Sequence, residues 1–303
     1  MGGSLARKAG VAAMVLGGLI TVSVTHAQRA EPKSQPAAME QYFDVVRERA
    51  PGLPRFTVYR PADLRGSKTK FPVVAWSNGA CTASNQGYMY FLMQLAARGF
   101  VVVAYGSPET ASAPNAVATE DRLKKAIDWA TSPSRSGGSP YHDRLDANRI
   151  ATMGHSCGGI DAVWTATHDA RVKAVVSLNS GCFPDDSDGG QSGPLAVCRQ
   201  HLEQLRGPAL FVAGGESDVA YPNSLGSFER TERVPVVFAS HATVGHSGFF
   251  NSAPRNVQAQ LVRAVVEFLD GTLNGKSERL VFLVGPNNEL GKLPDWIVKS
   301  KGF

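Results

Sequence analysis

The run Gly154-His155-Ser156-Cys157-Gly158-Gly159 carries the most specific chemical signal in the sequence. It follows the strand-like run Arg149–Met153 and precedes a helical pattern, which places the serine in a G-x-S-x-G turn between a strand and a helix. Glycines allow such a turn to be tight, and the helix behind it directs free N–H groups at nearby negative charge. The pattern therefore predicts that Ser156 is a nucleophile for acyl transfer. The alternative interpretation is a glycine-rich packing turn whose serine is incidental.

A serine nucleophile needs a base, and the base needs a carboxylate that orients it. In this type of site the acid follows the serine along the chain and the histidine comes last. Asp218 follows the apolar run ALFVA, and His246 follows VPVVFAS, so both are expected at the carboxyl ends of successive strands. Glu216 is the competing acid and His241 the competing base. His155 is expected to be a packed residue of the turn.

Acyl transfer also needs two N–H donors for the oxyanion. We expect one donor at the backbone N–H of Cys157, the residue after the nucleophile. The other is expected in the loop that follows the run PVVAW, at the N–H of Ala80 or, as the alternative, of Cys81. Two donors that point at one oxygen bring their loops together, which makes a Cys81–Cys157 disulfide geometrically feasible. Two free, buried thiols are the alternative.

Aromatic residues flank these motifs and either line a substrate pocket or belong to the core: Tyr88, Tyr90, Phe91, Phe249 and Phe250. Among them we expect Tyr88 and Phe249 to contact the substrate, together with Cys81 of the oxyanion loop. The sequence has no H-E-x-x-H or paired-cysteine motif and no glycine-rich phosphate loop. We therefore expect neither a metal ion nor a cofactor.

The elements that must position these residues are predicted from residue 55 onward, where short β-branched runs alternate with helical patterns. Strands are expected at 55–59, 72–76, 100–105, 149–153, 172–178, 209–213 and 234–239, and helices at 88–98, 119–131, 158–168, 199–205 and 257–269. Near-continuous apolar runs such as VVVAY are typical of strands buried on both faces of a parallel sheet. The sequence thus predicts an α/β fold, a doubly wound, mostly parallel sheet in a single domain, with ligands at the carboxyl ends of the strands.

The first 27 residues predict an export signal with a basic start, the apolar run Ala9–Val24 and a small-residue cleavage site at Ala27. A retained membrane anchor is the alternative, although the apolar run is shorter than the roughly 20 residues that a spanning helix needs. Residues 28–50 are expected to be an N-terminal lead-in, and residues 51–303 the globular domain. The mature protein is therefore expected in the periplasm or outside the cell, without a stable membrane anchor.

The four cysteines predict two disulfides, because exported proteins meet an oxidising environment. Three pairings are possible, and we favour Cys182–Cys198 together with Cys81–Cys157. The first bridge would close residues 182–198, a polar insertion rich in Gly, Asp and Ser.

Composition excludes several other classes of protein. The chain has 303 residues, of which 43% are hydrophobic, too many for a disordered chain, and four cysteines are too few for a disulfide scaffold. The net charge is +5, or +3 once Arg7 and Lys8 are removed with the export signal. No clustered basic stripe is present, so no nucleic acid partner is expected. Nothing in the sequence indicates an oligomeric state.

With these residues placed, the chain resembles the α/β-hydrolase superfamily from about residue 55 to 270. The stretches FTVYRPADL and FPVVAWSNGAC…LAARGFVVVAYGSP are similar to the dienelactone-hydrolase and chlorophyllase-like group, whose neighbourhood includes secreted cutinase-type polyester hydrolases. Exported and fungal relatives carry Gly-Asn-Gly-Gly-Cys in the oxyanion loop, where this chain has Ser77-Asn78-Gly79-Ala80-Cys81. Relatives place the carboxylate and the base at positions that match Asp218 and His246. The insertion at 182–198 departs from the compact polyesterase pattern.

The resemblance implies a serine hydrolase that cleaves a small or polymeric carboxylic ester through an acyl-enzyme, without a cofactor. The same catalytic groups serve an amidase or a depolymerase of an extracellular polyester or polyamide, which is the first alternative. A non-catalytic binding protein on the same fold is the alternative from another class.

Overall fold

The computed structural model describes residues 42–110, 121–132, 138–183 and 199–303. The export signal predicted at 1–27 and most of the insertion predicted at 182–198 lie outside the described residues.

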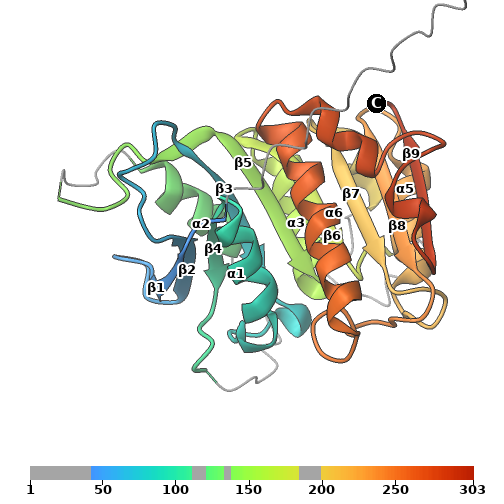
Figure 1. The fold of residues 1–303 in the computed structure, drawn as a ribbon, viewed down its shortest axis with the longest axis horizontal. Helices are drawn as coiled ribbons and strands as arrows, with labels where there is room; N and C mark the ends of the chain where they lie inside the picture. The colour runs from blue at the N-terminus through green and yellow to red at the C-terminus, as the bar shows by residue number, and fades with distance from the viewer. Residues whose placement is uncertain (1–41, 111–120, 133–137, 184–198) are drawn as a thin grey trace, which may run out of the picture. The chain divides into compact units, whose positions relative to one another are not determined.

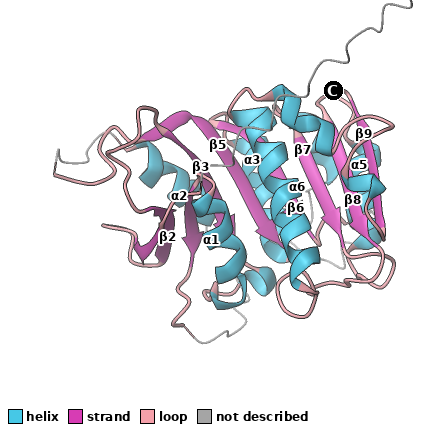
Figure 2. Ribbon diagram, viewed as in Figure 1, coloured by secondary structure: helices cyan, strands magenta, loops and turns pink. Residues whose placement is uncertain are grey.

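The described residues contain one mixed sheet of nine strands in the order β1-β2-β4-β3-β5-β6-β7-β8-β9 (Figures 1 and 2). Adjacent strands from β4 to β8 are parallel, whereas β1, β2 and β9 pair antiparallel to their neighbours. Among the central strands, β4 and β7 are apolar along their whole length and buried at every position. The strands are β1 (Val45–Arg49), β2 (Phe56–Pro61), β3 (Phe71–Ser77), β4 (Val101–Tyr105), β5 (Leu145–His155), β6 (Val172–Leu178), β7 (Ala209–Ala213), β8 (Val236–His241) and β9 (Trp296–Lys301).

Helices cover both faces of the sheet, because strands that are apolar on both faces must be shielded on both. Helices α1 (Met89–Ala97) and α6 (Arg255–Leu273) share one apolar core with the sheet and lie in front of it in Figure 1. The core on the opposite face includes residues of α2 (Arg122–Thr131), α3 (Cys157–His168) and α5 (Tyr221–Arg230). Short 3-10 helices complete the described chain: Gly79–Cys81, Gln86–Tyr88, Arg199–Gln204, Ser277–Phe282 and Leu290–Lys292.

The predicted fold class, a doubly wound and mostly parallel α/β sheet in a single domain, is confirmed. Every predicted strand forms within four residues of its expected bounds. Two outer strands, β1 and β9, and the helix α5 were not expected from the sequence, and β1 lies within the segment predicted as a lead-in. The segment that begins at Arg199 forms a 3-10 helix. No helix in the described part of the chain is long and apolar enough to cross a membrane.

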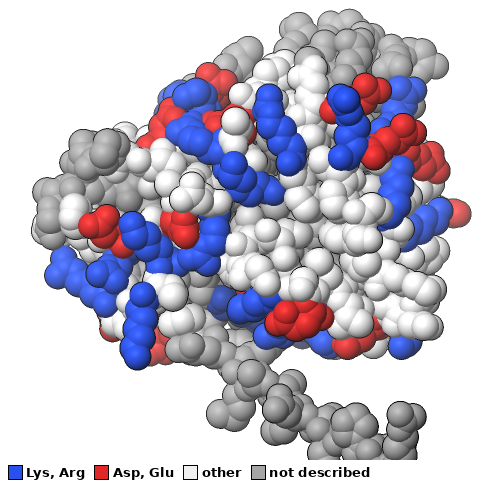
Figure 3. Space-filling view, turned by 90° about the horizontal axis from the view of Figure 1, so that it is seen from above, with Lys and Arg blue, Asp and Glu red and all other residues white. Residues whose placement is uncertain are grey.

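The amino ends of the parallel strands lie at the top of Figure 1, and Figure 3 shows this face, on which Lys and Arg side chains are interspersed with Asp and Glu. A cavity of about 980 Å³ opens on this face beside the start of β3. Ion pairs balance several of its cations, such as Lys276 with Asp270 at 2.9 Å and Arg149 with Asp146 at 2.7 Å. This cavity lies at the edge of the sheet opposite to the strand ends at which the sequence predicts chemistry.

Candidate active site

Ser156 stands at a sharp turn between β5 and α3. Its φ of 52° and ψ of −122° lie in a region that non-glycine residues rarely adopt, and its N–H donates to the Leu178 carbonyl at 2.9 Å. A Cβ at Gly158 would collide with the carbonyl of Ser77, so only glycine lets the first turn of α3 approach the end of β3. The tight turn presents the Ser156 hydroxyl at the carboxyl edge of the sheet.

Asp218, His246 and Ser156 form a continuous hydrogen-bonded chain. Nδ1 of His246 lies 2.6 Å from a carboxylate oxygen of Asp218, and Nε2 lies 2.9 Å from Oγ of Ser156. Asp218 and His246 belong to loops that follow β7 and β8, so the strand ends bring together three residues far apart in sequence. The imidazole is thus oriented to accept the Ser156 proton.

The carboxylate of Asp218 is fully buried and accepts four hydrogen bonds. Besides His246, its donors are the N–H groups of Gly214 and Ala220 at 2.9 Å and the side-chain amide of Asn179 at 2.8 Å. Burial alone would raise the pKa of Asp218, but these hydrogen bonds favour the charged form and lower the pKa to about 2. Asp218 therefore carries a negative charge beside His246 at neutral pH.

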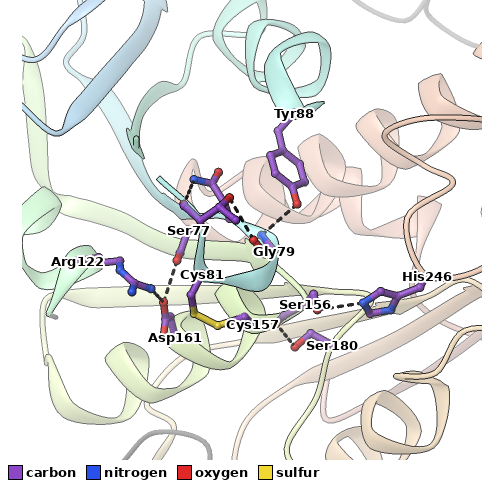
Figure 4. Close-up of a disulfide and its surroundings, with 12 residues drawn as sticks. Ser77, Gly79, Cys81, Tyr88, Arg122, Ser156, Cys157, Asp161, Ser180 and His246 are labelled. Atoms are coloured by element: carbon purple, nitrogen blue, oxygen red, sulfur yellow. Dashed lines mark hydrogen bonds and ion pairs between the residues drawn. A yellow bond between two sulfur atoms is a disulfide. The ribbon is translucent and has the colours of Figure 1, made fainter. Parts of the chain in front are cut away.

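The two predicted oxyanion donors are brought together by the disulfide between Cys81 and Cys157, whose Cα atoms are 5.5 Å apart (Figure 4). Ala80 and Cys81 both have positive φ, at 50° and 52°. Among the described residues, none accepts a hydrogen bond from the N–H of Ala80 or of Cys157. Both residues line cavities beside Ser156, so these donors are available to an oxygen bound there.

A buried ion pair holds the start of the oxyanion loop against α3 (Figure 4). Asp161 accepts a hydrogen bond from the Ser77 hydroxyl at 2.8 Å and pairs with Arg122 at 3.2 Å. Burial raises the pKa of Asp161, and the Ser77 and Arg122 contacts offset only part of that effect. Ser77 is the last residue of β3, so the pair fixes the position from which the loop departs.

Two cavities meet at Ser156 and His246. One, of about 380 Å³, is lined by the oxyanion loop, by Tyr88 and by Phe250. The other, of about 250 Å³, is more apolar and is lined by residues that include Ile160 and Phe183. A substrate whose scissile bond lies at Ser156 therefore has space on both sides of that bond.

The predicted substrate-contacting residues divide between these cavities and the core. Tyr88 lines the first cavity, but Phe249 does not, because it is only 2% exposed and stacks on Trp296 with ring centroids 5.8 Å apart. Its neighbour Phe250 lines the cavity instead. Cys81 is also buried, within its disulfide. The aromatic pair could not be separated from sequence, because which side chain points inward depends on the path of the loop.

The competing acid and base lie outside this constellation. Glu216 is exposed, and His241 is buried against Trp296 with ring centroids 5.3 Å apart. Asn179 and Ser180 also belong to the site, although the sequence did not indicate them. The Ser180 hydroxyl donates to the Ser156 carbonyl at 2.6 Å. Asn179 and Ser180 both follow β6 directly. Their position at the carboxyl end of a central strand is the feature of the sequence that could have indicated them.

The second predicted disulfide is only partly within the described chain. Cys182 is 4% exposed and disulfide-bonded. Its predicted partner, Cys198, lies outside the described residues. The N–H of Cys182 donates to the Ser227 hydroxyl in α5 at 2.9 Å, which fixes this end of the insertion.

The parallel sheet, the strained serine turn and the strand-end loops define the class of protein as an α/β-hydrolase. More specifically, the chain belongs to the PET hydrolase-like family, which matches residues 29–188, more than half of its length.

The chain is also similar to several bacterial cutinases. Cutinase est1 of Thermobifida alba is 29% identical over 141 residues, which are 45% of this chain and 44% of that protein. Cutinase 2 of Thermobifida cellulosilytica is 28% identical over 141 residues, which are 45% of this chain and 50% of that protein. The chain thus spans about half the length of the curated relatives it matches. The resemblance to cutinase-type polyester hydrolases is confirmed.

Proposed function

We propose that the protein hydrolyses carboxylic esters through Ser156, His246 and Asp218, by way of an acyl-enzyme. The observation that carries the proposal is the chain of hydrogen bonds from Asp218 through His246 to Ser156, at 2.6 and 2.9 Å. Membership of the PET hydrolase-like family supports it.

In the proposed reaction, Oγ of Ser156 attacks the ester carbonyl while Nε2 of His246 takes the serine proton. The negative charge that develops on the carbonyl oxygen is stabilised by the N–H groups of Cys157 and Ala80. His246 then gives the proton to the leaving alcohol. Water, activated by the same histidine, attacks the acyl-enzyme and releases the acid and the free serine.

We further propose that the ester can be part of a polymer and that the protein acts after export. The two cavities that meet at Ser156 support a chain that continues on both sides of the scissile bond. Several relatives bear the name cutinase. The Cys81–Cys157 disulfide supports an oxidising compartment, which agrees with the export signal expected at residues 1–27.

The test is hydrolysis of p-nitrophenyl esters from acetyl to palmitoyl and of a polyester film by the mature protein. Activity should disappear in Ser156→Ala, and a fluorophosphonate should label the wild-type protein but not the variant. Activity on soluble esters without release of acid from the film would contradict the polymer substrate. Fluorophosphonate labelling without ester hydrolysis would indicate that the substrate is an amide. A folded wild-type protein that is neither labelled nor active would be a binding protein.

A further inference from the structure

Tyr88 and His155, which take no direct part in the proposed reaction, connect the oxyanion loop to the loop of His246. The N–H of Gly79 donates to the Tyr88 hydroxyl at 3.0 Å (Figure 4). That hydroxyl lies 2.9 Å from Nδ1 of His155, and Nε2 of His155 lies 2.8 Å from the backbone carbonyl oxygen of His246. Three hydrogen bonds thus run in series beside Ser156, from the backbone of Gly79 to the backbone of His246.

The chemistry of the groups fixes the direction of each hydrogen bond. A carbonyl oxygen can only accept, so Nε2 of His155 carries the proton of a neutral ring, and Nδ1 must accept from the Tyr88 hydroxyl. Burial lowers the pKa of His155 to about 4, against the hydrogen bond to the His246 carbonyl, so the ring is neutral at neutral pH. Burial raises the pKa of Tyr88 to about 12, so its hydroxyl keeps the proton that it donates.

We propose that Tyr88 and His155 are positioning residues that hold the oxyanion donors and His246 in register across Ser156. Gly79 directly precedes Ala80, and His155, the last residue of β5, directly precedes Ser156, so the hydrogen bonds link the loops after β3 and β8 to the end of β5. This inference rests on the proposed ester hydrolysis. In this arrangement the Tyr88 hydroxyl accepts a hydrogen bond from the enzyme's own backbone and does not bind the substrate.

The space around Gly79 supports this arrangement independently. A Cβ at position 79 would lie 2.6 Å from the Tyr88 hydroxyl and 2.5 Å from Nδ1 of His155, so a larger residue would separate the two groups. The rings themselves are held by aromatic packing. Tyr88 and His155 each lie 4.9 Å from Phe250 between ring centroids, and Tyr88 lies 5.1 Å from Trp76. Removal of the Tyr88 hydroxyl alone should therefore break the chain without moving the ring.

The kinetic test compares Tyr88→Phe with Tyr141→Phe. Tyr141 is a buried tyrosine whose hydroxyl contacts Glu48 of β1, outside the active site, so its variant is the matched control. Tyr88→Phe should lower kcat for p-nitrophenyl butyrate about tenfold and leave KM within about twofold, because the oxyanion donors act mainly in the transition state. The control should retain the wild-type kcat. A raised KM at unchanged kcat would instead assign Tyr88 to substrate binding and overturn the proposal.

A spectroscopic test is independent of ester hydrolysis. Nitrogen-15 spectra of histidine-labelled protein should show His155 neutral at pH 7, with the proton on Nε2, and Tyr88→Phe should shift its Nδ1 signal while Tyr141→Phe does not. A proton on Nδ1, or a signal that Tyr88→Phe leaves unchanged, would overturn the inference. The expected spectrum from a protein that hydrolyses no ester would support the hydrogen-bond chain and contradict only the proposed function.

The variant His155→Asn tests the two hydrogen bonds of the imidazole separately. Asparagine places an amide at the position of Nδ1, which keeps a partner for Tyr88, but it does not reach the His246 carbonyl. If the link to His246 contributes to positioning, this variant should lose about tenfold in kcat although the Tyr88 contact is retained. A wild-type kcat in the folded variant would count against that link.

Discussion

Asp218 and His155 are both buried beside His246, yet only one of them carries a charge. Asp218 accepts four hydrogen bonds, enough to offset the loss of hydration, and its pKa falls to about 2. His155 has one acceptor and one donor as partners, an environment that suits the neutral ring and not the cation. The number and direction of hydrogen bonds therefore decide which buried group stays ionised.

This difference predicts how acid affects stability. Folded His155 binds a proton only near pH 4, whereas an unfolded histidine does so near its ordinary pKa of 6.5. The unfolded state therefore binds more protons between these values, and the free energy of unfolding should fall by about 3 kcal/mol as the pH drops through them. The pKa of Asp218 is lowered from 3.8 to about 2. Its contribution to the free energy of unfolding should therefore be lost only below about pH 4.

Urea unfolding of wild type and His155→Asn at pH 7 and pH 4.5 measures the histidine contribution. The variant should lose much less stability between the two pH values than the wild type. His142→Asn, which changes an exposed histidine outside the active site, is the matched control. Equal slopes for His155→Asn and wild type would contradict the buried neutral imidazole.

At the scale of elements, α3 holds the oxyanion loop at two points. Cys157 and Asp161 are four residues apart and so lie on the same face of the helix. The first is bonded to Cys81 at the end of the loop, and the second binds Ser77 at its start. The helix that begins behind the nucleophile therefore also fixes the loop that carries the second oxyanion donor.

Arg122→Met should test the second of these attachments. The variant leaves the carboxylate of Asp161 buried without its cation, which typically destabilises a protein by about 3 kcal/mol or more. The double variant Arg122→Met/Asp161→Asn removes the uncompensated charge and should recover part of the loss. Urea unfolding measures both effects, and an unchanged free energy of unfolding for Arg122→Met would show that the pair contributes nothing to the fold.

The central elements could be predicted because their sequences have a single stable environment. Runs such as VVVAY are too apolar to face water, and their alternation with helical patterns determines a parallel sheet. The outer strands β1 and β9 are half-exposed and contain charged residues, so their sequences resemble loops until a neighbouring strand is known. Helix α5 contains Gly226 in its interior, which weakens the helical pattern.

The site residues divide in a similar way. Ser156, Asp218 and His246 follow predicted strands within motifs of known chemistry, so sequence was enough to nominate them. The hydrogen bonds of Tyr88 and His155 depend on how two loops fold over one another, and no local pattern encodes that contact.

At the scale of the whole molecule, the Cys81–Cys157 disulfide closes a long segment of the chain. The two cysteines are 76 residues apart, and the segment between them includes β4 and β5. A cross-link of this span limits the conformations of the unfolded chain and is worth about 4 kcal/mol in the chain-entropy model. It therefore links the stability of the sheet to the geometry of the proposed oxyanion hole.

The double variant Cys81→Ser/Cys157→Ser should measure both contributions. Its free energy of unfolding should be about 4 kcal/mol lower than that of the wild type, and kcat for a short ester should fall because the Ala80 loop is less firmly held. Urea unfolding and steady-state kinetics provide the two values. The variant leaves Cys182 and Cys198 unchanged, so it removes only the Cys81–Cys157 disulfide. A reductant, by contrast, acts on every disulfide of the protein. Wild-type stability and kcat in the variant would contradict both roles.

The sheet ends on both sides in a charged strand. Arg47 and Arg49 are exposed on β1, and Lys299 is exposed on β9, with Lys301 two residues further along the same strand. An outer strand presents unpaired N–H and C=O groups that can recruit a strand from another molecule, and charged side chains oppose such pairing. Charged side chains on both outer strands of the described sheet therefore oppose edge-to-edge pairing between two copies of the protein.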